Sequence, residues 1–155
     1  MSFSQSSEYL GDVDLPALGE GAELVLPVNV PGALLSLGDA HAAQGDGEIT
    51  GAAIEIEAEV ELTCEVADRE AAGYIGLPQL NDRQSVGSVA GLEGANLSDC
   101  ARAAYRDLVL RISRHSGIPL TDAYQLVGQV GRLQVGNMMD PFASVRASVE
   151  RRYLA

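Results

Sequence analysis

A chain of 155 residues with 46% hydrophobic and 21% charged side chains can fold as one globular domain without disulfide bonds. Its formal net charge of −12 repels phosphate groups, which argues against binding to nucleic acid or to an anionic membrane surface. The sequence has no apolar run near the roughly 20 residues that span a bilayer and no pattern typical of an export signal. We therefore expect a cytoplasmic protein with reduced cysteines.

The N-terminal part of the sequence predicts short strands and a loop. Residues 1–10 are rich in Ser and predict a disordered segment. Residues 22–30 predict a strand, which Pro27 restricts to a sheet edge or divides. Residues 33–37 predict a brief buried run that leads into a loop rich in Gly and Asp. A loop directly after a buried segment is a common position for a functional site.

The strongest periodic pattern in the chain covers residues 54–66. Apolar and mostly acidic residues alternate there, which predicts a strand with one buried face and one acidic, solvated face. Arg residues of a neighbouring strand or of another subunit could instead pair with the Glu side chains. Cys64 occupies an apolar position of this pattern, so we expect it to be a small core residue and not a nucleophile.

The C-terminal part changes to helical periodicity. Residues 67–95 predict short strands and turns, and apolar spacings of three and four predict a helix over 98–116, with Asn96 or Ser98 as its cap. A second helix over 121–128 would be capped by Thr121. A strand over 132–138 and a turn at Asp140-Pro141 follow, and Met138-Met139 predicts core packing. Residues 143–154 are compatible with strand or helix.

These elements predict a mainly β fold with an α+β C-terminal part. We expect a single domain over residues 11–155, with a β-rich, β-sandwich-like half at 11–95 followed by helix, helix and strand at 96–155.

The loop over residues 38–48 has the densest set of reactive side chains in the chain. Its members are Asp39, His41, Gln44, Asp46 and Glu48, interleaved with Gly38, Gly45 and Gly47. Carboxylates and imidazole serve as acids, bases or metal ligands, and glycine allows a ligand to approach the backbone closely. An ordinary turn with a structural histidine is the competing interpretation.

The segment 26–48, Leu-Pro-Val-Asn-Val-Pro-Gly-Ala-Leu-Leu-Ser-Leu-Gly-Asp-Ala-His-Ala-Ala-Gln-Gly-Asp-Gly-Glu, resembles the signature of acetamidases and formamidases. Residues 121–127 and 139–141 resemble the C-terminal half of the same family. The resemblance implies hydrolysis of small linear amides to a carboxylate and ammonia. Members of that family are about twice as long, and their N-terminal half has no counterpart in this sequence. Residues 11–14 resemble a remnant of the motif that joins the two halves.

Amide hydrolysis requires an activated water, a donor to the developing oxyanion and a proton for the leaving amine. Asp39 or Glu48 could act as the base, and His41 as the proton donor or, with Glu48, as a ligand of a divalent metal such as zinc. Gln44 could orient the substrate. The other substrate-binding candidates are Gly45, Asp46, Gly47 and Asp14. No organic cofactor is expected.

Two interpretations of the molecule remain open from the sequence. An active hydrolase would bind a small amide and would form a homo-oligomer or take up a second chain that supplies the missing half. A non-catalytic binding or structural module derived from an amidase would keep the loop for its turns alone. A calcium-type site at residues 45–48 is a third, weaker hypothesis, because the alternating oxygen ligands of an EF-hand are absent.

Overall fold

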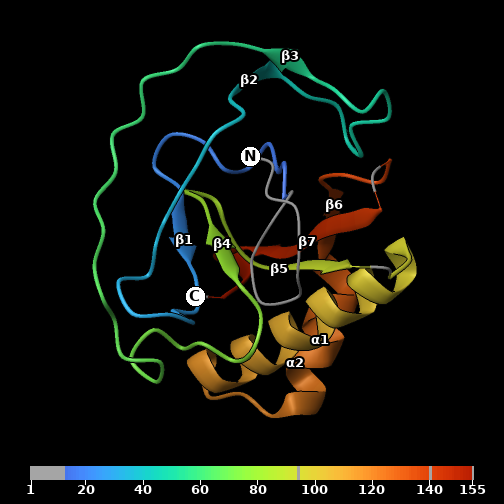
Figure 1. The fold of residues 1–155 in the computed structure, drawn as a ribbon. Coiled ribbons are helices and arrows are strands. Elements are labelled where there is room, and N and C mark those ends of the chain that lie inside the picture. Colours follow the sequence, from blue (N-terminus) through green and yellow to red (C-terminus); the bar gives the residue numbers. More distant parts are fainter. Residues whose placement is uncertain (1–12, 94, 140, 155) are drawn as a thin grey trace.

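The main body of the protein is a five-stranded antiparallel sheet with two helices packed on one face (Figure 1). A computed structural model describes residues 13–93, 95–139 and 141–154, so the segment 1–10 and Asp140 lie outside the described residues. Across the sheet the strands are β1 (Glu23–Val25), β4 (Gln79–Asn81), β5 (Ser85–Glu93), β7 (Phe142–Glu150) and β6 (Arg132–Val135). The helices are α1 (Leu97–Ser116) and α2 (Leu120–Val130), and a 3-10 helix covers Arg151–Tyr153.

Helix α1 forms where local signals predict it. The Asn96 side chain accepts a hydrogen bond from the Asp99 N–H at the first turn, and Gly117 ends the helix with a left-handed φ of 66°. Its apolar stripe, Cys100, Ala104, Leu108 and Ile112, is buried against the sheet. The predicted helix over 98–116 is therefore confirmed. The second helix is confirmed too, but Pro119 occupies its N-cap position and Thr121 lies inside its first turn.

Strand β7 is buried on both faces, and its alternation explains how. One set of side chains packs with α1 in the main core: Ala143, Val145, Ala147 and Val149. On the opposite face, Arg146 donates hydrogen bonds to the Leu80 carbonyl, the Asp82 carboxylate and the Ser85 hydroxyl. A buried guanidinium needs such partners. The C-terminal segment, compatible with strand or helix from its sequence, is thus a strand.

A second, smaller core lies on the face of the sheet away from the helices. Val13 and Leu15 pack there with Leu80 and Val89, and the hydroxyl of Ser144 donates to the Val13 carbonyl. This places the chain just after residue 12 next to the middle of the sheet. The predicted fold, mainly antiparallel β with two helices in the C-terminal part, is confirmed.

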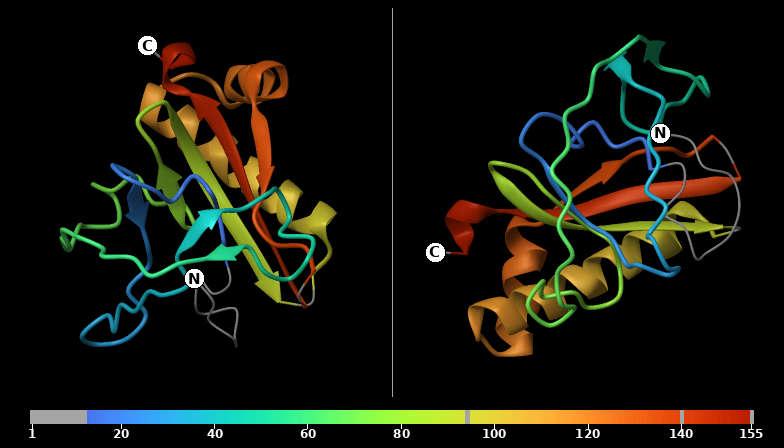
Figure 2. Two further views of the ribbon diagram at one scale, coloured as in Figure 1. Left: turned by 90° about the horizontal axis from the view of Figure 1, so that it is seen from above. Right: turned by 60° about the vertical axis from the view of Figure 1, so that its left-hand side comes forward.

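A small hairpin stands apart from the main sheet, on the side away from the helices (Figures 1 and 2). It pairs β2 (His41–Ala43) with β3 (Ile54–Glu55). Two long segments without regular secondary structure connect it to the main body, residues 26–40 before it and residues 56–78 after it. No helix among the described residues is long and apolar enough to cross a membrane.

Three sequence predictions about burial are wrong. Residues 33–36 are exposed, with Leu34 at 77%, so no buried run leads into the loop. The strand predicted over 54–66 pairs only at Ile54–Glu55, and every residue from 54 to 66 is exposed on both sides of the alternation, Cys64 included. Met138 and Met139 are half exposed. Cys100 is buried, as its helical position indicates, and its thiol donates a hydrogen bond to the Ala143 carbonyl; neither Cys64 nor Cys100 forms a disulfide.

Candidate functional site

The loop between β2 and β3 is fixed to the end of β6 by backbone hydrogen bonds. The Gly47 N–H donates to the Val135 carbonyl at 2.9 Å, and the Gly47 carbonyl accepts from the Met138 N–H at 3.1 Å. Gly47 has a φ of 82°, and a Cβ there would lie 2.7 Å from the Met138 sulfur. A residue with a side chain would therefore be strained at this position. The two hydrogen bonds hold the loop next to the end of β6.

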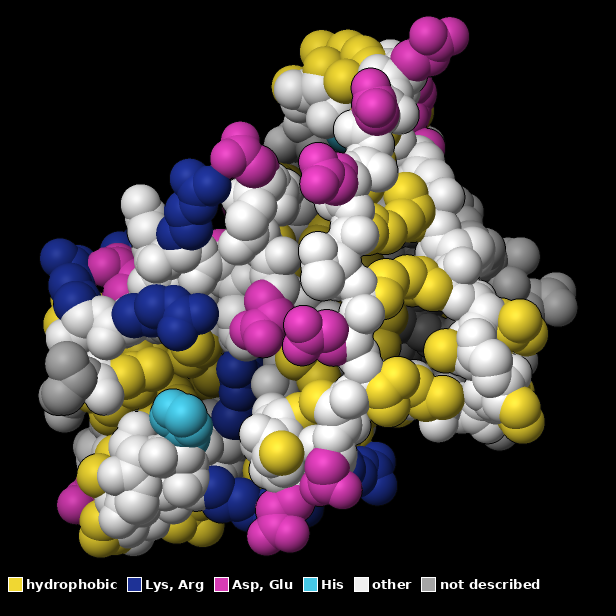
Figure 3. All heavy atoms as spheres, turned by 90° about the vertical axis from the view of Figure 1, so that its left-hand side faces the viewer, with side chains coloured by type: hydrophobic (Ala, Val, Ile, Leu, Met, Phe, Trp, Pro, Cys, Tyr) yellow, Lys and Arg dark blue, Asp and Glu magenta, His cyan; other side chains and the backbone are white. Residues whose placement is uncertain are grey.

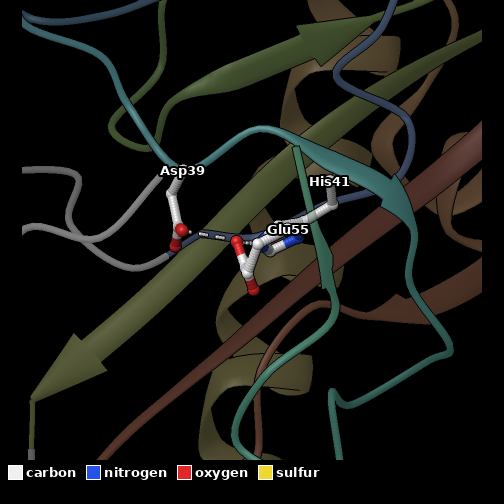
Figure 4. A group of neighbouring side chains, drawn as sticks. All are labelled: Asp39, His41 and Glu55. Atoms are coloured by element: carbon white, nitrogen blue, oxygen red, sulfur yellow. Dashed lines mark ion pairs between the residues drawn. The ribbon is translucent and has the colours of Figure 1, made fainter. Parts of the chain in front are cut away.

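Three side chains meet at the hairpin (Figure 4). His41 and Glu55 are opposite each other in the β2–β3 pair, and Nε2 of His41 lies 3.2 Å from Oε2 of Glu55. Asp39 precedes β2 with a left-handed φ of 64°, and its Oδ1 lies 3.6 Å from the same nitrogen. One ligand atom of each residue lies within 4.8 Å of the other two. The hairpin thus brings an imidazole and two carboxylates close together.

Gln44 determines which nitrogen of His41 carries the proton. The amide nitrogen of Gln44 donates to the carbonyl oxygens of Asp14 and Gly136, which leaves its Oε1 facing Nδ1 of His41 at 3.2 Å. Because Oε1 only accepts, Nδ1 is the protonated nitrogen of the neutral ring. Nε2 then presents its lone pair to Glu55 and Asp39. Histidine ligands of metals commonly have their second nitrogen held in this way.

The centre of the triad is rich in acceptors. Nε2 of His41 is buried and makes no hydrogen bond within the described structure, because the approach to Glu55 lacks hydrogen-bond geometry. Two carboxylates and an imidazole lone pair around one point repel unless a proton or a cation lies between them. The arrangement therefore fits either a protonated His41 or a bound divalent cation.

Opposing influences act on the His41 proton. Burial lowers the pKa of His41, but the hydrogen bond to Gln44 and the charges of Glu55, Asp39 and Glu48 outweigh it, and the net shift is upward. The ring side chain is 8% exposed. The carboxylates thus attract positive charge to this position, whether it arrives as a proton or as a metal ion.

Glu48 and Asp14 form a second acidic pair next to the triad. Both are buried, and both have left-handed backbones, with φ of 43° and 34°. Burial raises the pKa of Glu48, the charge of Asp14 raises it further, and His41 partly offsets the shift. Glu48 is outside the three-residue ligand group, in which Glu55 stands beside Asp39 and His41. A carboxyl with a raised pKa is suited to exchange a proton near neutral pH.

The remaining predicted site residues divide into engaged and exposed ones. The N–H of Gly47 is bonded to Val135, so it is not directed at a substrate oxygen. Both ends of the Gln44 amide are engaged, the oxygen with His41 and the nitrogen with the backbone. Gly45 and Asp46 are exposed at the tip of the loop. Gly11 and Asp12 lie outside the described residues.

Glu55 is a candidate site residue that the sequence does not predict. It stands in a row of alternating glutamates that resembles a solvated strand face. The signal that distinguishes it is its position after a stretch with three glycines, at 45, 47 and 51, which allows the chain to return and pair with residues 41–43. Strand pairing then places Glu55 across from His41.

The sequence of this chain, including the hairpin, matches a known protein family. The sequence profile of the Acetamidase/Formamidase family matches residues 5–129. The chain belongs to the acetamidase/formamidase family. A curated relative, "Putative formamidase C869.04" of Schizosaccharomyces pombe, is 46% identical over 57 residues, which are 36% of this chain and 14% of that protein.

Solved acetamidase structures share the fold of the family member described here. The acetamidase of Yersinia enterocolitica is 34% identical with a TM-score of 0.76, and the match covers 94% of this chain and 42% of that one. The acetamidase of Bacillus halodurans is 27% identical with a TM-score of 0.75, covering 92% of this chain and 47% of that one. Nearly all of this chain is thus acetamidase-like, and it spans less than half the length of these two enzymes.

Proposed function

We propose that this chain carries part of the active site of an amide hydrolase that converts small linear amides, of the formamide or acetamide type, to a carboxylate and ammonia. The observation that carries the proposal is that the family match includes the segment in which His41, Asp39 and Glu55 converge around a buried, unbonded nitrogen. A buried histidine beside two carboxylates does not contribute the burial energy of a hydrophobic contact. Such a cluster on a loop fixed to the sheet therefore favours a functional role.

We further propose that Asp39, His41 and Glu55 hold a divalent metal ion such as zinc. The fit rests on three acceptor groups within 4.8 Å and on the tautomer that Gln44 imposes. Bound by these residues, such an ion would supply a water with a pKa lowered towards about 7 and a positive charge for the amide carbonyl oxygen. Glu48, predicted from the sequence to bind a metal together with His41, then serves better as the proton-transfer group.

Other side chains of this chain have separate roles in the proposed reaction. Gln44 positions His41, and Glu48 is the group whose raised pKa allows it to take a proton from the attacking water and to return it to the leaving amine. Asp14 sustains that pKa through its charge. Asp46 and Gly45, exposed at the loop tip, are in a position to contact the substrate.

Completion of the site by a second polypeptide or a second copy is part of the proposal. The chain spans 42% and 47% of the two solved acetamidases, and this partial coverage supports a contribution to the site from the part of the fold that the chain does not span.

Ammonia release from formamide and acetamide tests the proposed function. We expect release by the chain, alone or combined with the part of an acetamidase that it does not span, in buffers with and without added zinc. His41→Ala and Glu55→Gln should each reduce the rate at least 100-fold, and they should also lower the zinc content of the purified protein. Glu70→Gln, an exposed glutamate outside the site, is the matched control. Absence of turnover under every condition would reject the proposal.

A further inference from the structure

The segment 56–66, here called the arm, has the pattern of a strand but no strand neighbour. It runs around the outside of the molecule between β3 and the turns that precede β4 (Figure 1). The Ile56 N–H donates to the Ala40 carbonyl, and no other hydrogen bond between described backbones involves the arm. All eleven residues are exposed. The arm therefore leaves a row of backbone donors and acceptors open to another strand.

One side of the alternation is apolar although it faces solvent. Its largest members are Ile56, Val60, Leu62 and Val66, which are exposed by 49%, 49%, 53% and 96%. Figure 3 faces this side of the molecule and shows hydrophobic side chains gathered beside the long segment that crosses it. Single exposed apolar residues are common, but four at every second or fourth position of an unpaired segment form a stripe of the kind that sheets bury.

The other side of the alternation shows which occupants are compatible. It carries Glu57, Glu59, Glu61 and Glu65. If two copies of the arm paired, these rows of glutamates would face each other directly, and like charges across a strand pair are destabilising. The whole chain adds to the repulsion with a net charge of −12. A second copy is therefore a poor partner for this surface.

The length of the relatives indicates a better occupant. About 92–94% of this chain aligns with acetamidases of which it covers 42–47%, so the rest of that fold is available to cover surfaces that are bare here. We propose that the arm adds as a strand to a sheet of the part of the acetamidase fold that this chain does not span. This inference rests on the proposed function, because it names the surface through which the site is completed.

The chemistry of the arm specifies the partner's edge strand. The partner strand is expected to place apolar side chains against Ile56, Val60 and Leu62. On its other side it is expected to place Arg or Lys side chains against the glutamate row. Main-chain hydrogen bonds supply most of the contact. The two side-chain rows fix the register, because a shift by one residue would set glutamates against the apolar face.

Cys64 provides a direct probe of this pairing. It lies on the apolar side of the arm, is exposed and is free, whereas Cys100 is buried. The tagged full chain is co-expressed with the part of the Yersinia enterocolitica acetamidase that the match leaves uncovered. We expect the two to co-elute in gel filtration. Maleimide labelling of Cys64, followed by mass spectrometry of its peptide, should be at least tenfold slower in the complex than in the chain alone.

Two substitutions test whether association depends on the arm and not on any exposed apolar residue. Leu62→Asp places a charge on the apolar side and should weaken association at least tenfold. Leu120→Asp changes a leucine of similar exposure, 51%, at the start of α2 and should leave association unchanged. Both residues are exposed in the chain alone, so neither variant should alter its thermal unfolding, and a lost complex cannot be ascribed to misfolding.

Several outcomes would overturn the inference. They are no association, a complex in which Cys64 reacts at its free rate, equal effects of the two aspartate variants, and a homo-oligomer of the chain alone in which Cys64 is protected. Ammonia release is measured separately. A complex with a protected Cys64 and no turnover contradicts the proposed function and leaves the arm pairing standing. Turnover by the chain alone with a freely reactive Cys64 does the reverse.

Discussion

At the scale of single residues, the site depends on how His41 is held. Gln44 bonds to Nδ1 of His41 with its oxygen and to the backbone of Asp14 and Gly136 with its nitrogen, so one side chain links the hairpin to two distant parts of the chain. The sequence predicts a site in the loop over residues 38–48, and the structure brings Asp39 and His41 of that loop together with Glu55. The pairing of His41 with Glu55 depends on a hairpin register, which no motif in the sequence encodes.

Removal of Gln44 should weaken metal binding without unfolding the protein. In Gln44→Ala the imidazole loses the acceptor that fixes its tautomer, and losses of about 10- to 100-fold in metal affinity are typical for such supporting residues. Zinc affinity measured by competition with a chromophoric chelator checks this. Asp46→Asn, at an exposed position of the same loop, is the control. Unchanged zinc affinity in Gln44→Ala would show that the bond to His41 is incidental.

Glu48→Gln should stabilise the protein at neutral pH. An unfolded glutamate has a pKa of about 4.3, and burial together with Asp14 raises the pKa of Glu48 in the folded chain. The folded state therefore binds the proton more tightly, and stability falls as pH rises from the unfolded to the folded pKa, with the full cost above that window. Glutamine removes this cost.

The measurement is urea unfolding of both proteins at pH 8 and pH 4. We expect a higher midpoint for Glu48→Gln at pH 8 and a much smaller difference at pH 4, together with reduced ammonia release. A gain in stability with a loss of activity is the expected behaviour of a functional charge. Glu70→Gln should change neither quantity. Destabilisation by Glu48→Gln at pH 8 that shrinks at pH 4 would mean that the Glu48 carboxylate is stabilising and would contradict the prediction.

At the scale of elements, helices are predicted from local sequence more reliably than strands, whose formation depends on a neighbouring strand. The helix α1 is predictable because its cap, its apolar spacing and its terminal glycine all lie within its own sequence. The residues 54–66 carry an equally regular pattern, yet only Ile54–Glu55 pair, because a strand needs a neighbour that its own sequence does not supply. The exposure of Cys64 follows from the same missing neighbour.

The N-cap of α1 gives a quantitative check on this view. Asn96→Ala removes the acceptor for the Asp99 N–H and should cost about 1 kcal/mol in the free energy of unfolding. Asn96→Ser keeps a capping oxygen and should cost much less. Ser98→Ala tests the other residue that the sequence offered as a cap, and it should be nearly neutral because Ser98 lies inside the helix. Urea denaturation at pH 7 measures all three, and a larger loss in Ser98→Ala would contradict the assignment.

At the scale of the whole molecule, the chain consists of a packed body and a loosely attached hairpin. The body contains the sheet and both helices around one main core. The hairpin is fixed through Gly47 and Gln44, while the arm makes one backbone bond at its first residue. Exposed segments with few bonds open at low free energy, so proteolysis should distinguish the two parts.

Limited digestion with a protease that cleaves after glutamate should cut first in the arm, after Glu57, Glu59, Glu61 or Glu65. The nicked protein should stay together, because β1 remains paired with β4 across the cut and Gly47 remains bonded to Val135. We expect co-elution of both fragments in gel filtration and an unchanged helical circular dichroism signal. A first cut after Glu23 in β1 or after Glu150 in β7, or separation of the fragments without denaturant, would contradict this division. If zinc binds at the hairpin, it should slow fragment separation in urea, since a ligand of the folded state alone stabilises it.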